Sequence, residues 1–118
     1  MKLVIARELQ EYVNPDGKSP FKEWFGRLKD AKTQRIIVKR LDRVQLGNLG
    51  DNKSLGEGLF ELRIDYGPGY RIYLGEHGPV IVILLCAGDK STQAVDIRRA
   101  STYWKDYRRT HSEPHQTV

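Results

Sequence analysis

Two arginines and one lysine have the side chains and the spacing to hold a phosphate group. Arg63 and Arg71 lie in two neighbouring segments that alternate between apolar and polar residues, as paired strands covered on one face do. Lys90 follows the next apolar segment and precedes a predicted helix, whose positive dipole end disfavours a cation. If the three side chains converge, they could surround one phosphate. The alternative for Lys90 is a side chain that extends into water at little cost.

The convergence depends on the register of the hairpin between the two segments. A three-residue loop at 67–69 places Asp65 opposite Arg71 and Arg63 opposite Tyr73. The two arginines are then diagonal neighbours on the face away from the apolar residues. An exposed salt bridge from Asp65 to Arg71, worth less than about 1 kcal/mol, is the alternative to a functional role for Arg71.

Other catalytic chemistries lack the residues they need. A metal site requires clustered ligands, yet His77 is expected at a hairpin tip and His111 and His115 fall in the C-terminal tail. A nucleophile requires a neighbouring base, and no histidine of a predicted helix or strand lies near Cys86 or Ser91. We therefore expect neither a metal nor a cofactor.

The composition is that of one small basic domain. The chain has 118 residues, of which 39% are hydrophobic, enough for a single modest core. Its formal charge of +5 makes a polyanionic or acidic partner plausible. Charged residues interrupt the N-terminal segment too early for a signal peptide, and no apolar run approaches the ~20 residues of a membrane span. We expect a cytoplasmic protein whose lone cysteine, Cys86, is buried in a strand.

Apolar periodicity and turn residues predict an α+β domain over residues 1–109, followed by a disordered tail over 110–118. Ser19 and Pro20 have the residue types of a helix start, and the unbroken apolar run 80–87 is typical of a central strand covered on both faces. The expected elements, in chain order, are a strand within 3–12, helices at about 20–29 and 31–46, a loop at 47–52, strands around 60–66, 70–74 and 80–87, and a helix at about 92–108.

The second predicted helix is basic as well as amphipathic. Ile37, Leu41 and Val44 form its apolar stripe. Its cations are Lys32, Arg35, Lys39, Arg40 and Arg43. Such a face is usually only solvated, but it could equally serve a phosphate backbone.

Three segments carry a resemblance to a known family: residues 59–64 (LFELRI), 67–73 (GPGYRIY) and 84–97 (LLCAGDKSTQAVDI). Together with Pro20, Phe21 and Trp24 in the first predicted helix, they resemble the RelE/ParE toxin superfamily, most closely its HigB-like branch of addiction-module killer proteins. The resemblance extends over about residues 3–107. It implies an N-terminal strand, two helices, a three-stranded antiparallel meander and a C-terminal helix, in agreement with the periodicity.

The resemblance also implies a reaction. Nucleases of this superfamily cut messenger RNA, usually on the translating ribosome, by directing the substrate's own 2′-hydroxyl at the adjacent phosphate without a metal. Arg63 and Arg71 would stabilise the negative charge of the pentavalent phosphate, because an arginine stays protonated and is a poor base. Lys90 would neutralise or protonate the leaving 5′-oxygen.

The general base is open at this point. Some relatives carry a tyrosine or histidine near the start of the last helix, where this chain reads Gln93-Ala94-Val95-Asp96. Asp96 could be the base or a surface carboxylate. Tyr73 could stack on a nucleobase. Lys53, in the predicted loop before the second strand, lies where relatives place further basic residues.

The sequence thus predicts the toxin of a type II toxin–antitoxin module, with messenger RNA on the ribosome as its substrate and no membrane partner. The family implies a cognate antitoxin, of helix-turn-helix type, whose acidic segment folds on the basic surface. Two alternatives use the same fold: a ParE-like inhibitor of DNA gyrase that acts by protein binding, and a non-toxic relative that only binds an antitoxin.

Overall fold

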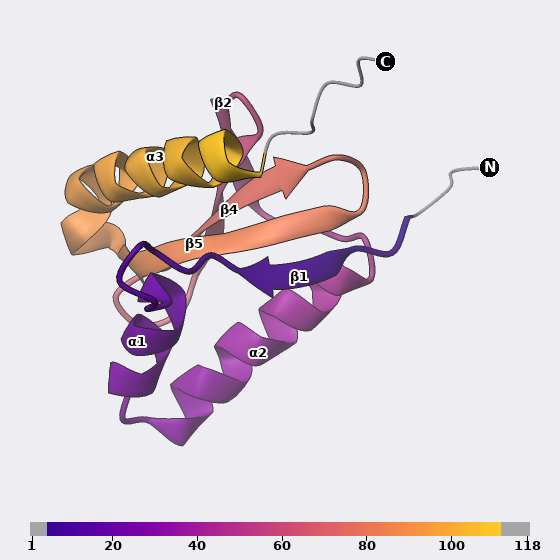
Figure 1. Cartoon of the computed structure of the whole chain (residues 1–118). Coiled ribbons are helices and arrows are strands. Elements are labelled where there is room, and N and C mark those ends of the chain that lie inside the picture. Colours follow the sequence, from indigo (N-terminus) through magenta and orange to yellow (C-terminus); the bar gives the residue numbers. More distant parts are fainter. Residues whose placement is uncertain (1–4, 112–118) are drawn as a thin grey trace, which may run out of the picture.

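The computed structural model describes residues 5–111, which form a mixed sheet with α1 and α2 on one face and α3 on the other (Figure 1). This arrangement confirms the α+β class. The elements are β1 (Glu8–Glu11), α1 (Pro20–Arg27), α2 (Ala31–Gln45), β2 (Asn52–Gly56), β3 (Leu59–Ile64), β4 (Tyr70–His77), β5 (Ile81–Asp89), the 3-10 helix η1 (Lys90–Thr92) and α3 (Gln93–Thr110).

The sheet has the strand order β1-β5-β4-β3-β2. The pairs β2–β3, β3–β4 and β4–β5 are antiparallel, so the predicted meander is present. The N-terminal strand β1 runs parallel to β5 at the sheet edge, which gives β5 neighbours on both sides. Hydrophobic clusters lie on both faces of the sheet, and Cys86 is buried on the α3 face as predicted.

One strand was not predicted. The sequence predicts a loop that includes Asn52 and Lys53 and a strand only from about residue 60, but Asn52–Gly56 forms β2 and pairs with β3. Its residues are polar and mostly exposed, so β2 has none of the apolar alternation by which a strand is recognised. Lys53 therefore lies in a strand, directly opposite Glu61, and the prediction of a loop position for it is wrong.

The hairpin register also differs from the prediction. Arg63 pairs with Arg71, and Glu61 pairs with Tyr73, two residues away from the expected pairing. The connection is longer than expected because Ile64 already pairs with Tyr70. A shift of two residues leaves each side chain on the same face of the sheet, so the predicted separation into an apolar and a polar face holds.

Helix boundaries follow their capping residues. Ser19 accepts a hydrogen bond from the backbone N–H of Lys22 and is followed by Pro20, as predicted. The Asp30 side chain caps α2 in the same way.

The last helix continues through Thr110, beyond the predicted end of the domain. Residues 112–118 of the predicted tail lie outside the described residues. Among residues 5–111, no helix is long and apolar enough to cross a membrane.

Arg40 is the one α2 cation that the sequence placed wrongly. It is 8% exposed, and its guanidinium donates to the backbone carbonyls of Leu49, Asp51 and Arg63, at 2.9, 2.5 and 2.5 Å. Burial and the nearby Arg43 lower the Arg40 pKa, while Asp51 raises it. Arg40 therefore joins α2 to the α2–β2 loop and to β3, and it is not part of a surface for RNA.

We predict that Arg40→Met lowers the free energy of unfolding by about 3 kcal/mol, because buried carbonyls lose a charged donor. Lys39→Met, on the neighbouring exposed position, should change it by less than about 0.5 kcal/mol. Urea denaturation at neutral pH measures both values. Equal effects of the two substitutions would contradict the assignment of Arg40 to the interior.

Candidate functional site

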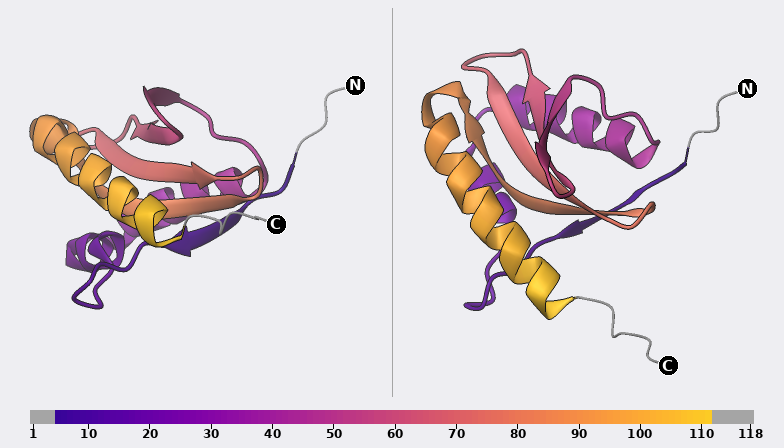
Figure 2. Two further views of the ribbon diagram at one scale, coloured as in Figure 1. Left: turned by 45° about the horizontal axis from the view of Figure 1, so that its top comes forward. Right: turned by 90° about the horizontal axis from the view of Figure 1, so that it is seen from above.

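Arg63 and Arg71 occupy directly opposite positions on β3 and β4. They lie on the face of the sheet that α3 covers only in part, because α3 packs on β5 and β4 (Figure 2). The Arg63 side chain is 35% exposed. Like charges placed directly across two strands repel each other, so this pairing costs stability unless an anion lies between them. The observed register brings the two cations closer than the predicted diagonal arrangement.

Lys90 joins these arginines from the end of β5. It is the first residue of η1, and its side chain is exposed. Gly69 lies between it and Arg71: a Cβ atom on Gly69 would be 3.5 Å from Arg71 Nη1 and 3.5 Å from Lys90 Cβ. The structure thus brings together the three residues that the sequence singled out, and we call Arg63, Arg71 and Lys90 the cation cluster.

Within residues 5–111 the cation cluster contacts one carboxylate, that of Glu61, through Arg63. Arg63 Nε donates to Glu61 Oε1 at 3.0 Å, while the Tyr73 hydroxyl and Gln93 Nε2 donate to Oε2 at 3.0 and 2.8 Å. The Glu61 side chain is fully buried, which raises its pKa, but these hydrogen bonds outweigh burial and leave the pKa below its ordinary value. Glu61 is therefore an ionised group that fixes the Arg63 guanidinium.

Sequence reasoning did not single out Glu61 or Gln93 as site residues. One signal was available for Glu61, which lies two residues before Arg63 and so on the same face of the strand. No local pattern identifies Gln93, because its contact with Glu61 joins residues 32 positions apart.

Arg71 and Lys90 keep their charge available. Arg71 Nη1 donates to the Tyr70 carbonyl at 3.2 Å, and its buried Nε has no hydrogen-bond partner. Neither residue forms an ion pair with any of residues 5–111, so the salt bridge from Asp65 to Arg71 considered above is not made. An arginine with free donors beside an exposed lysine is suited to a phosphate oxygen.

The structure argues against the two candidates for base and stacking residue. Tyr73 is fully buried, and its hydroxyl donates to Glu61, so it cannot stack on a nucleobase; burial and this carboxylate raise its pKa far above the usual value.

Asp96 is 3% exposed and so is not a surface carboxylate. It accepts hydrogen bonds from Arg99 at 3.1 Å and from the Thr92 hydroxyl at 2.5 Å. A Cβ atom on Gly88 would overlap the Asp96 carboxylate. Asp96 therefore holds the start of α3 against β5.

The remaining predicted cations fall into two groups. Lys53 is exposed and lies on β2, directly opposite Glu61. Paired residues share a face of the sheet, so Lys53 lies on the same face as Glu61. The exposed α2 cations lie on the opposite side of the sheet, so they do not join the cation cluster. They are Lys32, Arg35, Lys39 and Arg43.

Comparison with known proteins identifies a relative of this chain. No protein-family model matches the chain. An uncharacterized protein of Haemophilus influenzae is 52% identical over 80 residues, which are 68% of this chain and 81% of that protein. The chain belongs to the family of this protein. The relative's description names no activity, so the function is argued from the site itself.

The site holds three cations against one buried carboxylate, in a position open to solvent on one side. The arginines are permanently charged, and Glu61 supports Arg63 without neutralising Arg71 or Lys90. Among the described residues no group of three histidine, cysteine or acidic side chains is placed to hold a metal ion. What this arrangement can do is bind an anion and stabilise charge that increases on it.

We predict that Glu61→Gln lowers the free energy of unfolding at pH 7 by about 1–3 kcal/mol, because a buried charge-assisted network is weakened. The Glu61 pKa is depressed in the folded protein, so its contribution is present above the ordinary carboxyl value of 4.5 and is lost as pH falls below it. The stability difference between the two proteins should therefore shrink from pH 5 to pH 3 in urea titrations.

The matched control is Glu57→Gln, which changes an exposed carboxylate paired with Arg108 at 3.0 Å. Its effect should stay under about 1 kcal/mol, since exposed ion pairs contribute little. A difference between wild type and Glu61→Gln that is constant down to pH 3 would show that Glu61 is not held ionised.

Proposed function

We propose that this protein is the toxin of a type II toxin–antitoxin module, a RelE-like, metal-independent endoribonuclease that cuts messenger RNA on the ribosome. The observation that supports the proposal most is the direct pairing of Arg63 with Arg71 next to Lys90. Arg63 pairs with Glu61, but Arg71 and Lys90 form no ion pair within residues 5–111, so the cluster carries excess positive charge that a phosphate would offset. The sequence resemblance to HigB-like proteins points to RNA as the source of that phosphate.

In the proposed reaction, the 2′-hydroxyl of the substrate attacks the adjacent phosphorus. The 2′-hydroxyl loses its proton to water and the bond to the 5′-oxygen of the next nucleotide breaks; that oxygen takes up a proton from Lys90 or water, which leaves a 2′,3′-cyclic phosphate and a 5′-hydroxyl. Arg63 and Arg71 stabilise the additional negative charge of the pentavalent phosphate. Lys90, which is exposed, neutralises the leaving 5′-oxygen. We assign no general base to the chain, because Glu61 and Asp96 are both buried and engaged.

The proposed partners follow from charge. A cytoplasmic antitoxin of helix-turn-helix type, with an acidic segment that folds on the toxin, would neutralise a chain of formal charge +5. The exposed cations of α2 would lie near ribosomal RNA phosphates, and because Arg40 is buried they are Lys32, Arg35, Lys39 and Arg43.

We predict that induced expression of the wild type arrests growth and that sequencing of transcript ends shows cuts within coding regions. Arg71→Ala and Lys90→Ala should each reduce cleavage by about 10²–10³-fold, since each removes a donor to the transition state. Lys105→Ala is the matched control, because this exposed lysine lies on α3 about 18 Å along the helix axis from its start. Chelation of divalent metals should not protect RNA in an assay that does not itself need them.

A toxic protein that leaves transcripts intact would overturn the proposal. If Arg71→Ala and Lys90→Ala remain toxic and the protein blocks DNA supercoiling by gyrase, it is a gyrase inhibitor. A harmless wild-type protein that still forms a tight complex with the product of a neighbouring gene is a binding module alone.

A further inference from the structure

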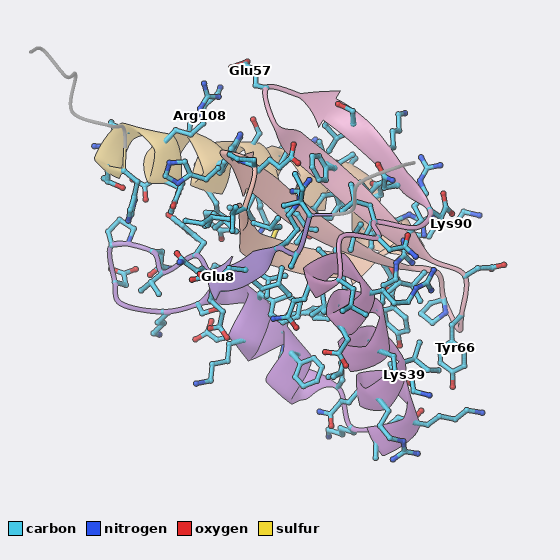
Figure 3. All side chains as sticks on the ribbon, turned by 90° about the vertical axis from the view of Figure 1, so that its right-hand side faces the viewer. Glu8, Lys39, Glu57, Tyr66, Lys90 and Arg108 are labelled. Atoms are coloured by element: carbon cyan, nitrogen blue, oxygen red, sulfur yellow. The ribbon has the colours of Figure 1, made fainter. Side chains whose placement is uncertain are left out.

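The hairpin between β3 and β4 lies between the cation cluster and the basic residues of α2. Tyr66 is part of this hairpin, and its ring projects at the edge of the molecule (Figure 3). We infer that Tyr66 is a platform on which a base of single-stranded RNA stacks, next to the phosphate held by the cation cluster, and that Lys32 binds the backbone beside it. This inference rests on the proposed function and specifies how the substrate strand is held.

The hairpin holds Tyr66 in a fixed position. Its backbone N–H donates to the Ile64 carbonyl at 2.9 Å, and its own carbonyl accepts from the N–H of Gly69 at 3.0 Å. Gly69 has a φ of 82°, a conformation that other residues rarely adopt. The same glycine abuts Arg71 and Lys90, as described above, so the turn that orients Tyr66 also contacts the cation cluster. A stacking group held in this way loses little conformational freedom when it binds.

Tyr66, and not Tyr70, is the ring available for a base. The Tyr70 ring packs edge-on against Trp24, with centroids 5.9 Å apart, and a Cβ atom on Gly67 would lie 3.5 Å from it. Both contacts tie Tyr70 to its neighbours. Tyr66 is partly buried against the core, but within residues 5–111 no other aromatic ring packs on it, and Lys32 Nζ lies 5.9 Å from its ring centroid.

An aromatic ring flanked by cations is the combination by which proteins bind single-stranded nucleic acid, with bases on the ring and phosphates on the cations. Lys32 lies over the Tyr66 ring, and Gly69, whose N–H donates to the Tyr66 carbonyl, abuts Lys90. Lys32, Lys39 and Lys90 form no ion pair within residues 5–111. A strand that leaves the cation cluster can therefore pass over Tyr66 and continue onto α2.

We predict that Tyr66→Leu weakens binding of a short, fluorescently labelled RNA, made uncleavable by 2′-O-methylation, by about 5-fold to 150-fold. This range corresponds to the loss of one base–aromatic stack of 1–3 kcal/mol, at 1.4 kcal/mol for each factor of ten. Leucine retains an apolar side chain against the core, so thermal unfolding should change little. Tyr66→Phe, which keeps the ring, should bind within about twofold of wild type. Fluorescence anisotropy measures the dissociation constants.

Lys32→Gln tests the second half of the inference. The slope of log affinity against log salt should become shallower by about 0.7, the value for one phosphate contact with a single strand. Lys105→Gln, far along α3, should leave the slope unchanged.

The outcomes separate the inference from the proposed function. If the wild type binds and cleaves RNA but Tyr66→Leu binds as tightly as Tyr66→Phe, the stacking role is overturned and the nuclease proposal stands. If Lys32→Gln leaves the salt slope unchanged, the backbone contact is overturned. If the wild type neither binds nor cleaves RNA, the proposed function fails, and the inference fails with it.

Discussion

The buried carboxylate of Glu61 connects β3, β4 and the start of α3 at the site. It receives hydrogen bonds from Arg63 on β3, Tyr73 on β4 and Gln93 at the start of α3. A buried charge of this kind is tolerated only because its oxygens are satisfied by donors, and one of those donors is itself a cation. The position of α3 on the sheet and the orientation of the Arg63 guanidinium are thus set by the same group. Neutralising it would loosen both at once.

The sequence predicted the faces of the sheet correctly and the pairings incorrectly, for a physical reason. Side-chain direction in a strand repeats every two residues, so the alternation of apolar and polar residues assigns each side chain to a face without knowledge of its partner. Pairing depends on the turn, and the turn here is longer than Gly67-Pro68-Gly69 suggests. The Arg63–Arg71 opposition could therefore not be derived from the pattern, although the face that carries both arginines could.

The α2 cations show a second limit. Arg40 and Lys39 are adjacent and both basic, yet one is buried beneath three carbonyls and the other is exposed. What separates them is the path of the loop after α2, which brings the carbonyls of Leu49 and Asp51 over one side of the helix. The sequence shows no such path, because β2, the strand that follows the loop, is polar and gives no periodic signal. Asp96 was misread for a similar reason, since only the packing of α3 on Gly88 buries it.

The parallel pairing of β1 with β5 has a consequence for the order in which the chain can fold as it is synthesised. β1 is made long before its partner β5, and Gln93, which completes the shell around Glu61, is made after both. A nascent chain that stops before β5 leaves β1 without its partner, and one that stops before α3 leaves the buried Glu61 carboxylate without one of its donors. The cation cluster is therefore assembled only after β5 and the start of α3 have been made, so a polypeptide that lacks them does not yet carry the site.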